Sequence, residues 1–374
     1  MRIHIIFDVF LTKDGRRKSI GGVETYISNL CNVFSHHGYE VSVYQISNQD
    51  FEKEYDGIKV YGYSIPANKR RGKHLLEKCR MYFDYKQDIV IFGNDLITCH
   101  AKNMRSITIQ HGVFWDIPRR SCNSNLLFGI KYIIKCLEAW SIIKRASYSD
   151  RLICVDYNFL NWYRAVVPFS RIKMHVIPNF TRIAEYNVKP SDLDPNLPVK
   201  IIFARRFWDY RGTRIFLGAA QRLLSTYKNI DITLAGDGPD EGMLRHALEQ
   251  YENIHFITYD SKESLFIHAD MDIAVVPTLA SEGTSLSLLE AMSAQCAVVC
   301  TNVGGMTNIV IDGYNGIMVN PDSGSLYEAI DALIVDADLR KKLADTAYKT
   351  AKEGFSFERW EASWIKVIES FEEV

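Results

Sequence analysis

The sequence predicts an α/β protein built from two doubly wound parallel sheets, and two observations lead to this fold class. With 374 residues, the chain is longer than one hydrophobic core usually grows, so two domains are expected. Short apolar runs bounded by turn residues alternate with longer helical patterns in both halves, which is typical of parallel βα units. Two such series in one chain indicate two separate sheets.

The predicted strands are continuous apolar runs, as expected for strands that are buried on both faces of a parallel sheet. In the first half they are IHIIF, EVSVYQI, DIVIFGN, SITIQHG, RLICV and KMHVIP. In the second half they are VKIIFA, DITLAG, IHFIT, MDIAVVP, AVVCTN and GIMVN.

The two series of strands meet near the segment HVIPNF, which sets the expected domain boundary. We expect one domain at 1–178 and a second at 179–355. Residues 356–374 carry aromatic and aliphatic side chains at helical spacing, which predicts a C-terminal helix that packs back toward the first domain.

Composition describes an ordinary globular protein, but the charge is unevenly distributed. Apolar residues make up 47%, charged residues 24% and aromatic residues 12%, which argues against a disordered chain. Residues 1–178 contain 26 Lys and Arg against 16 Asp and Glu, whereas the remainder contains 18 against 29. Either the basic half faces an anionic surface or substrate, or the two halves attract each other, and both interpretations stay open.

The chain shows no metal-ligand spacing and no membrane span. Its eight cysteines include no C-x2-C pair, so we expect reduced core thiols, no structural metal and a cytoplasmic protein. The apolar start is interrupted by Asp8 and no cleavage site follows, which favours a strand over a signal peptide. The apolar stretch at 126–143 contains Lys131, Lys135 and Glu138, which predicts an amphipathic helix.

Motifs directly after predicted strands are candidate binding elements, because ligands of open parallel sheets lie beyond the carboxyl ends of the strands. In TLASEGTSLSLLEAM, Glu282 lies in a loop that opens a helix, and Glu290 follows eight residues later. Carboxylates only accept hydrogen bonds, so the pair suits a hydroxylated ligand such as a sugar. The alternative is one glutamate favoured by the helix dipole and one incidental glutamate on a helix face.

The turn AGDGP contains G-x-G but lacks the third glycine of a dinucleotide-binding fingerprint, which argues against a dehydrogenase. We therefore expect Gly236 and Gly238 to be mainly structural.

SEGTSLSLLEAMSAQCAVVCTNVGGMTNIVIDGYNGIMVNP closely resembles the E-x7-E region of the retaining family 4 glycosyltransferases, whose GT-B fold consists of two Rossmann-like domains that face each other across a cleft. GGVETYISNLCNVFSHHGYEVSVY resembles that family's glycine loop and first helix, and ARRFWDYRG resembles its G-R-x4-K-G stretch. LAGDGPDEGMLR is similar to its G-x-G-P turn and VIPNF to its interdomain crossover. These matches span nearly the whole chain in the right order, so together they are much more specific than one E-x7-E.

The resemblance implies a metal-independent hexosyltransferase that needs no cofactor and takes a nucleoside diphosphate sugar as donor. It also implies that the domain at 1–178 binds the acceptor and that the domain at 179–355 binds the nucleotide sugar. Arg206 takes the place of the family's arginine and Arg211 that of its lysine, so both are expected to hold the donor diphosphate. Glu282 is expected to bind hydroxyls of the donor sugar near the anomeric carbon. The backbone N–H groups that would assist belong to Gly283, Thr284 and Ser285.

Other roles implied by the resemblance are distributed over both domains. Glu290 would bind the ribose diol, and Gly21 and Gly22 would let the backbone approach the donor phosphate at a helix N-terminus. His111 would position the transferred sugar. Without the resemblance, a Gly-Gly pair is a turn and a lone histidine at a strand end is more often structural. The sequence departs from the family where Ala204 or Arg205 replaces a frequent glycine.

No carboxylate is placed as a nucleophile, so a double displacement is not supported. The resemblance implies front-face retention instead, in which the departing phosphate oxygen helps to deprotonate the acceptor hydroxyl.

The sequence indicates the acceptor less specifically than the donor. Basic residues beside apolar ones at 15–18, 68–83 and 118–135 indicate either contact with an anionic membrane surface or ordinary solvated helices. A glycan or lipid-linked acceptor in cell-surface polysaccharide biosynthesis, such as that of lipopolysaccharide or capsule, is therefore a hypothesis, with the enzyme peripheral at the inner face of the membrane. No RNA- or DNA-binding motif accompanies the charge, so nucleic acid is not expected.

Two alternative functions remain compatible with the sequence. One is a nucleotide-sugar epimerase or hydrolase of the same fold, and the other is a non-catalytic nucleotide-sugar-binding protein.

Overall fold

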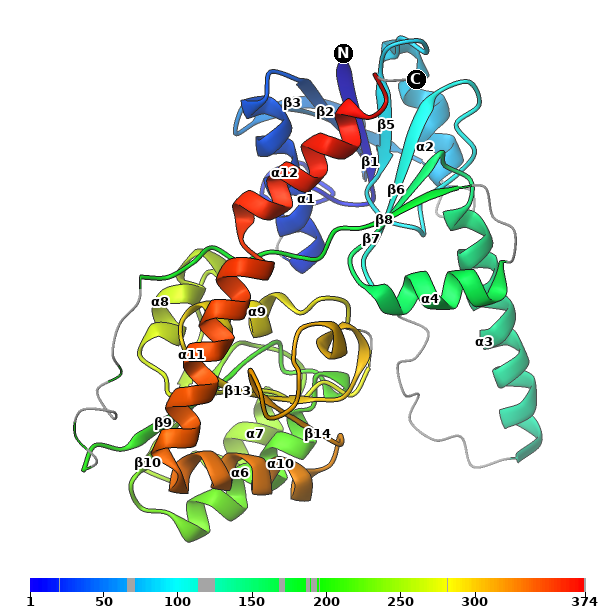
Figure 1. Ribbon diagram of the computed structural model, residues 1–374. Coiled ribbons are helices and arrows are strands. Elements are labelled where there is room, and N and C mark those ends of the chain that lie inside the picture. The colour runs from blue at the N-terminus through cyan, green and yellow to red at the C-terminus, as the bar shows by residue number, and fades with distance from the viewer. Residues whose placement is uncertain are drawn as a thin grey trace. The chain divides into compact units, whose positions relative to one another are not determined.

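The computed structural model describes residues 1–19, 21–65, 71–113, 125–167, 172–185, 189, 194, 196–280 and 282–372, with backbone only for 125–132 and 261. The chain forms two compact units (Figure 1). The first contains Met1–Gly112, Ser121–Pro178 and Glu361–Val374, and the second is built mainly from Asn179–Trp360. Parts of the basic stretches at 68–83 and 118–135 lie outside the described residues.

The first unit has an eight-stranded sheet in the order β3-β4-β2-β1-β5-β6-β7-β8. All described neighbours in it pair in parallel except β3, which is antiparallel to β4. The strands are β1 (Arg2–Phe7), β2 (Glu40–Ser47), β3 (Phe51–Tyr55), β4 (Ile58–Ser64), β5 (Ile89–Phe92), β6 (Arg105–Gln110), β7 (Arg151–Cys154) and β8 (Lys173–Val176).

Helices cover both faces of this sheet, as expected for a doubly wound fold. Leu75 and Leu76 of α2 pack against Ile6 and Tyr44 on one face, whereas Phe34 of α1 contacts the C-terminal helix on the other. The helical elements of this unit are α1 (Gly22–His36), α2 (Arg71–Cys79), the 3₁₀ turn η1 (Arg80–Tyr82), α3 (Asn125–Ala146) and α4 (Tyr157–Val166).

The second unit has a six-stranded, fully parallel sheet in the order β11-β10-β9-β12-β13-β14. Neighbouring residues of its central strand β9 enter separate cores, Ile201 and Phe203 on one face and Ile202 and Ala204 on the other. The strands are β9 (Val199–Ala204), β10 (Ile230–Ala235), β11 (Ile254–Ile257), β12 (Ile273–Val276), β13 (Ala297–Thr301) and β14 (Ile317–Val319).

The helical elements of the second unit lie on both faces of its sheet (Figure 1). They are η2 (Asp209–Arg211), α6 (Thr213–Thr226), α7 (Glu241–Leu248), η3 (Ser261–Glu263), α8 (Ser264–Ala269), α9 (Leu286–Ser293), η4 (Gly304–Asn308), α10 (Ser323–Val335) and α11 (Ala337–Gly354). The predicted α/β fold class with two doubly wound parallel sheets is therefore confirmed.

Every predicted apolar run is a strand, but the prediction missed β3 and β4. The sequence of β3 is FEKEY, and its central residues Glu52, Lys53 and Glu54 are exposed. Charged side chains are common on an edge strand because they discourage pairing with other chains. An exposed edge strand of this kind contains no continuous apolar run, and such a run is the pattern from which the other strands were predicted.

The C-terminal helix α12 (Phe357–Glu369) confirms the helical pattern predicted there, and its residues from Glu361 onward belong to the first unit. Trp364 is fully buried and its indole Nε1 donates to the hydroxyl of Tyr26 in α1 over 2.8 Å. The guanidinium of Arg151 donates to the carbonyls of Val367 and Ser370, at 2.7 Å for Ser370. These bonds fix the end of the chain to the first sheet.

The stretch at 126–143 forms the helix α3, as predicted. Among the described helices, none is long and apolar enough to cross a membrane. The described cysteines are free, but the expectation that all are core residues is wrong for Cys136, which is exposed on α3.

Candidate active site

The E-x7-E motif lies at the carboxyl ends of the strands of the second unit. Glu282 lies in the loop between β12 and α9, and Glu290 lies in the second turn of α9. Arg205 directly follows the neighbouring strand β9, and Arg211 ends the turn η2. The edge of the sheet where ligands of parallel sheets bind thus presents both acidic and cationic groups.

Glu282 forms ion pairs with two arginines. Its Oε2 accepts from Nη2 of Arg205 at 2.7 Å, from Nη1 of Arg211 and from Oγ1 of Thr278 at 3.2 Å. Burial by itself raises the pKa of Glu282, but the charges of the two guanidiniums outweigh it and hold the pKa below its ordinary value. Glu282 is therefore an ionised hydrogen-bond acceptor at neutral pH.

Arg205 is the arginine that the structure brings to Glu282, whereas the sequence analysis expected Arg206 to hold the donor diphosphate together with Arg211. The Arg205 side chain is only 6% exposed and also donates to the hydroxyls of Ser285 and Ser287 at 3.3 and 3.2 Å. Arg206 is exposed. Consecutive residues of an extended segment point to opposite sides, so shifting the alignment by one residue exchanges the two side chains.

Close backbone packing shapes the Glu282 loop, and a glycine pair permits it. A Cβ on Gly304 would lie 2.3 Å from the carbonyl oxygen of Glu282, and one on Gly305 would lie 2.3 Å from the carbonyl carbon of Gly283. The N–H of Gly305 donates to the Glu282 carbonyl at 2.9 Å. The sequence analysis missed this pair, although two adjacent glycines after strand β13 indicate close approach of backbone.

The glycines of AGDGP have the structural role that was predicted. Gly236 and Gly238 both have positive φ, and a Cβ on either would clash with the backbone carbonyls of Arg205 or Phe207. They hold the turn of β10 against the segment that carries Arg205.

The three residues between Glu282 and α9, Gly283 to Ser285, are buried. Ser285 is the N-cap residue of α9, and the carbonyl of Thr284 accepts from Nδ2 of Asn179 at 2.5 Å. The loop that carries Glu282 is therefore held between η4 and Asn179, with which the main segment of the second unit begins.

Glu290 lies in a different environment from Glu282. Its Oε2 accepts from Oγ of Ser264 at 2.7 Å. Burial raises the pKa of Glu290 to about 7, although the Ser264 bond and the charge of Arg205 act in the opposite direction. Burial and the nearby Glu290 charge also raise the pKa of Tyr259 to about 12. The sequence analysis identified neither Ser264 nor Tyr259.

The first unit holds the other predicted residues. Gly21 is the N-cap and Gly22 the first residue of α1, as the predicted glycine loop requires. His111 follows β6, contacts the ring of Tyr26 edge-on and places Nε2 2.8 Å from the carbonyl oxygen of Gly93. A carbonyl only accepts, so Nε2 carries the hydrogen and Nδ1 keeps its lone pair. Burial lowers the pKa of His111 to about 4, so the ring is neutral at pH 7.

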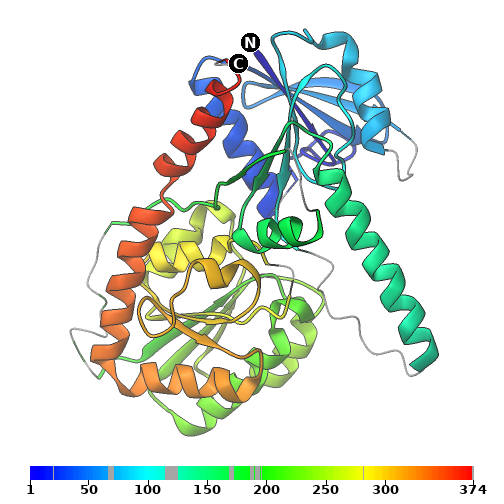
Figure 2. The same ribbon diagram turned by 45° about the vertical axis from the view of Figure 1, so that its right-hand side comes forward.

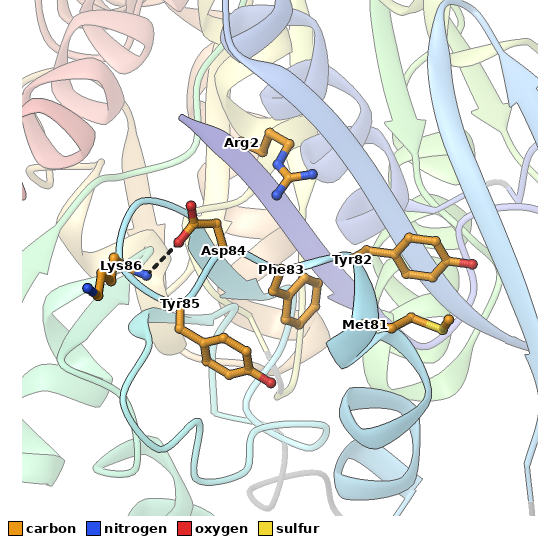
Figure 3. A pocket seen from close by; sticks show the side chains of 7 residues that line it. All are labelled: Arg2, Met81, Tyr82, Phe83, Asp84, Tyr85 and Lys86. Carbon is orange, nitrogen blue, oxygen red and sulfur yellow. Dashed lines mark hydrogen bonds between the residues drawn. The ribbon is translucent and has the colours of Figure 1, made fainter.

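A shallow pocket of about 610 Å³ lies elsewhere in the first unit, between Arg2 and residues 81–86 (Figure 3). Arg2 begins β1 and residues 81–86 precede β5, so this pocket is at the amino ends of those strands. It lies at the opposite sheet edge from His111 and Gly22 and contains none of the predicted site residues.

The chain is similar to known glycosyltransferases along most of its length. Residues 20–185 match the family model described as Glycosyltransferase Family 4, and residues 198–336 match Glycosyl transferases group 1. An uncharacterised glycosyltransferase of Methanocaldococcus jannaschii is 25% identical, with 94% of this chain and 95% of that protein covered. A phosphatidyl-myo-inositol mannosyltransferase of Mycobacterium leprae is 25% identical, with 86% of each chain covered.

The fold is shared with solved structures as well. The Anabaena protein HepE, crystallised in complex with UDP, has a TM-score of 0.68 at 16% identity, with 99% of this chain and 100% of that chain covered. The matched models together span most of the chain, and they cover the glycine loop, the two arginines and both glutamates. The chain therefore belongs to the family 4 glycosyltransferases, which have the GT-B fold.

Proposed function

We propose that this glycosyltransferase transfers a hexose from a nucleoside diphosphate sugar to a glycan or lipid-linked acceptor, with retention of anomeric configuration. The observation that carries the proposal is the cluster of Arg205, Arg211 and Glu282 at the carboxyl edge of the second sheet. It presents two cations and one ionised hydrogen-bond acceptor side by side, which matches the charge pattern of a sugar diphosphate.

The arginines supply the electrostatic part of the reaction. Negative charge develops on the nucleoside diphosphate as it leaves, and preorganised guanidiniums stabilise that charge. Because two fixed cations stand at this site, we propose that the reaction needs no metal ion. Arg205 takes the role that the sequence analysis assigned to Arg206, and Arg211 keeps its role.

The two glutamates recognise hydroxyl groups. Glu282, ionised and only 9% exposed, accepts hydrogen bonds from the transferred sugar. Glu290 accepts from the ribose diol, with Ser264 fixing one of its oxygens. Support for a nucleotide donor comes from the structural neighbour HepE, which was crystallised with UDP.

The proposed reaction breaks the bond between the anomeric carbon and the phosphate oxygen and forms one from that carbon to the acceptor oxygen on the same face. The acceptor proton passes to the departing phosphate oxygen. His111, neutral and held by Gly93, contributes to binding the sugar rather than to proton transfer. Gly21 and Gly22 contribute backbone N–H groups to the donor phosphate.

Two observations support a lipid-linked acceptor. The mannosyltransferase relative is named for an inositol phospholipid, and residues 1–178 carry a clear excess of basic side chains. A lipid-linked acceptor of cell-surface polysaccharide synthesis would place the enzyme at the cytoplasmic face of the membrane.

A thermal-shift screen of UDP-, GDP-, ADP- and dTDP-sugars with EDTA tests the donor site. We expect one base to raise the melting temperature of the wild type, with the shift lost in Arg205→Ala and Glu290→Ala. Stabilisation that is equal in the variants would refute the site. Sugar released or epimerised at full rate without any acceptor would instead identify a hydrolase or epimerase.

A further inference from the structure

The outward face of α3 in the first unit carries a stripe of exposed apolar side chains. Ile133, Leu137 and Trp140 follow each other at spacings of four and three residues, so they lie on one side of the helix. They are 58%, 62% and 49% exposed, and the adjacent Ile134 is 46% exposed. Side chains of this size are rarely grouped on a solvent-facing surface without a partner.

This stripe is separate from the surface by which α3 packs on its own unit. Ile142, Ile143 and Ala146, near the end of the helix, are almost completely buried. In Figure 2, most of α3 stands clear of the sheet of its unit. The helix is therefore apolar on its packed side and again on its free side, where an ordinary surface helix is polar.

The net charge of α3 and the position of Lys144 indicate what covers the stripe. The helix contains Lys131, Lys135, Lys144 and Arg145 against one acidic residue, Glu138. Lys144 is exposed and follows Trp140 by four residues, so it lies at the end of the same stripe. A second copy of this chain would bring two basic helices together, whereas an anionic lipid surface neutralises them.

We propose that the α3 face, defined by Ile133, Ile134, Leu137, Trp140 and Lys144, docks on an anionic lipid surface. The helix lies in the plane of the interface, with its apolar side chains among the acyl chains, Lys144 reaching the headgroups from the end of the stripe, and Lys131 and Lys135 on the side that faces water. Tryptophan is favoured at that depth because its ring is apolar and its N–H is polar. Docking of this kind would hold the first unit beside a lipid-linked acceptor.

Sedimentation of the full chain with vesicles tests the proposal. We expect binding to equimolar phosphatidylglycerol and phosphatidylcholine at low salt, and weak binding to phosphatidylcholine alone. Leu137→Gln combined with Trp140→Gln should lower binding about tenfold or more, because both side chains lose their apolar contact with lipid. Lys144→Glu should weaken binding only to the anionic vesicles.

The matched control is Phe266→Gln in α8 of the second unit, where the side chain is 83% exposed. It removes a comparable exposed ring and should leave vesicle binding unchanged. All these side chains are exposed, so the thermal midpoints of the variants should equal that of the wild type.

Three results would overturn the proposal: no binding of the wild type to anionic vesicles, equal binding of the double variant, or a dimer of the wild type that the double variant abolishes. The last result would show that a second copy covers the stripe. Vesicle binding is measured without donor or turnover, so its failure and a failure of the proposed sugar transfer are distinguished.

Discussion

Arg205 and Glu282 are 77 residues apart in sequence, yet Nη2 of the arginine donates to Oε2 of the glutamate over 2.7 Å. They meet because β9 and β12 are neighbours in the second sheet and both residues follow the carboxyl ends of these strands. The pair is almost entirely buried, which strengthens its electrostatic interaction relative to a surface pair.

Arg205→Ala should therefore damage the enzyme far more than Arg206→Ala. Without Arg205, the diphosphate loses a fixed cation and Glu282 loses a partner, so we expect kcat/KM to fall by roughly 10²-fold or more. The exposed side chain of Arg206 should matter much less. Steady-state kinetics of both variants with one donor provide the comparison.

Arg205→Lys serves as the control for charge alone, because a lysine cannot contact Glu282 and the two serines with a planar fork. It should recover only part of the loss. If Arg206→Ala is the more damaging substitution, the assignment made from the sequence is right and the geometry found here is not the functional one.

Much of the site was predictable from sequence because its residues come shortly after predicted strands. Glu282 and Glu290 were identified in a motif after an apolar run and Arg211 through the family resemblance, and the structure places all three at one sheet edge. The exchange of Arg205 and Arg206 could not be resolved in the same way. A motif fixes spacing, but which of two adjacent side chains turns inward depends on where the strand ends.

Ser264 and Tyr259 were missed for a different reason. They come from the β11–α8 region and reach Glu290 only through tertiary packing. The sequence there, TYDSKES, contains no residue spacing that indicates a partner for a glutamate on α9. The β3–β4 edge was missed because its strands alternate charged and apolar residues or lack a long apolar run.

Donor affinity should depend on pH through Glu290. The ionised carboxylate accepts both ribose hydroxyls, whereas the protonated form accepts less well. Because the pKa is about 7, affinity should rise as pH increases toward 7 and level off above it. Calorimetric titration with the intact nucleotide sugar measures this, since the terminal phosphate of a free nucleoside diphosphate itself titrates near pH 6.

Two variants make the assignment specific. Glu290→Gln should bind weakly with no pH dependence in this range. Ser264→Ala removes the 2.7 Å hydrogen bond that favours the ionised form, so it should move the midpoint to higher pH. A wild-type midpoint that persists in Glu290→Gln would assign the titration to another group.

The raised pKa of Glu290 also predicts that the free energy of unfolding depends on pH when no donor is bound. A carboxyl group whose folded-state pKa exceeds its ordinary value of 4.5 stabilises the fold most below that value. Its contribution decreases as pH rises and is lost above about 7. The pH dependence of urea unfolding of Glu290→Gln should lack this component.

Gly304→Ala should disable the site without unfolding the protein. Its φ of +56° disfavours a side chain, and the added Cβ would lie 2.3 Å from the Glu282 carbonyl oxygen. The loop must shift, and a displacement of about 1 Å at a catalytic group can cost roughly 10²-fold in rate. Donor kinetics together with the thermal midpoint separate a shifted site from a destabilised fold.

Gly242→Ala is the matched control, because Gly242 lies in helix α7 and a Cβ added there would meet no atom within 4 Å beyond its chain neighbours and the backbone of its own helix. It should keep full activity and raise stability by up to about 1 kcal/mol. Unchanged kinetics in Gly304→Ala would show that the Glu282 loop does not depend on this close approach.

We expect buried Lys189 to contribute to the free energy of unfolding through the carbonyl groups that surround it. It is only 7% exposed, and its Nζ donates to the carbonyls of Ala269 and Ala294, both at 2.7 Å. These carbonyls lie at the C-terminal ends of α8 and α9, where the helix dipole favours a cation. Lys189→Met should lower the free energy of unfolding by roughly 2–3 kcal/mol, measured by urea denaturation.

Lys200→Met provides the comparison for Lys189→Met, because Lys200 forms a 2.6 Å ion pair with the exposed Asp270. A surface pair of this kind contributes only about 0–1 kcal/mol, and its carboxylate stays hydrated when the lysine is removed. The bond from Lys189 to the Ala294 carbonyl is buried and that to the Ala269 carbonyl is partly buried, so these acceptors are less accessible to water than the Asp270 carboxylate. Equal losses in the two variants would mean that Lys189 contributes no more than a surface lysine, and that α8 and α9 are held together by their apolar contacts alone.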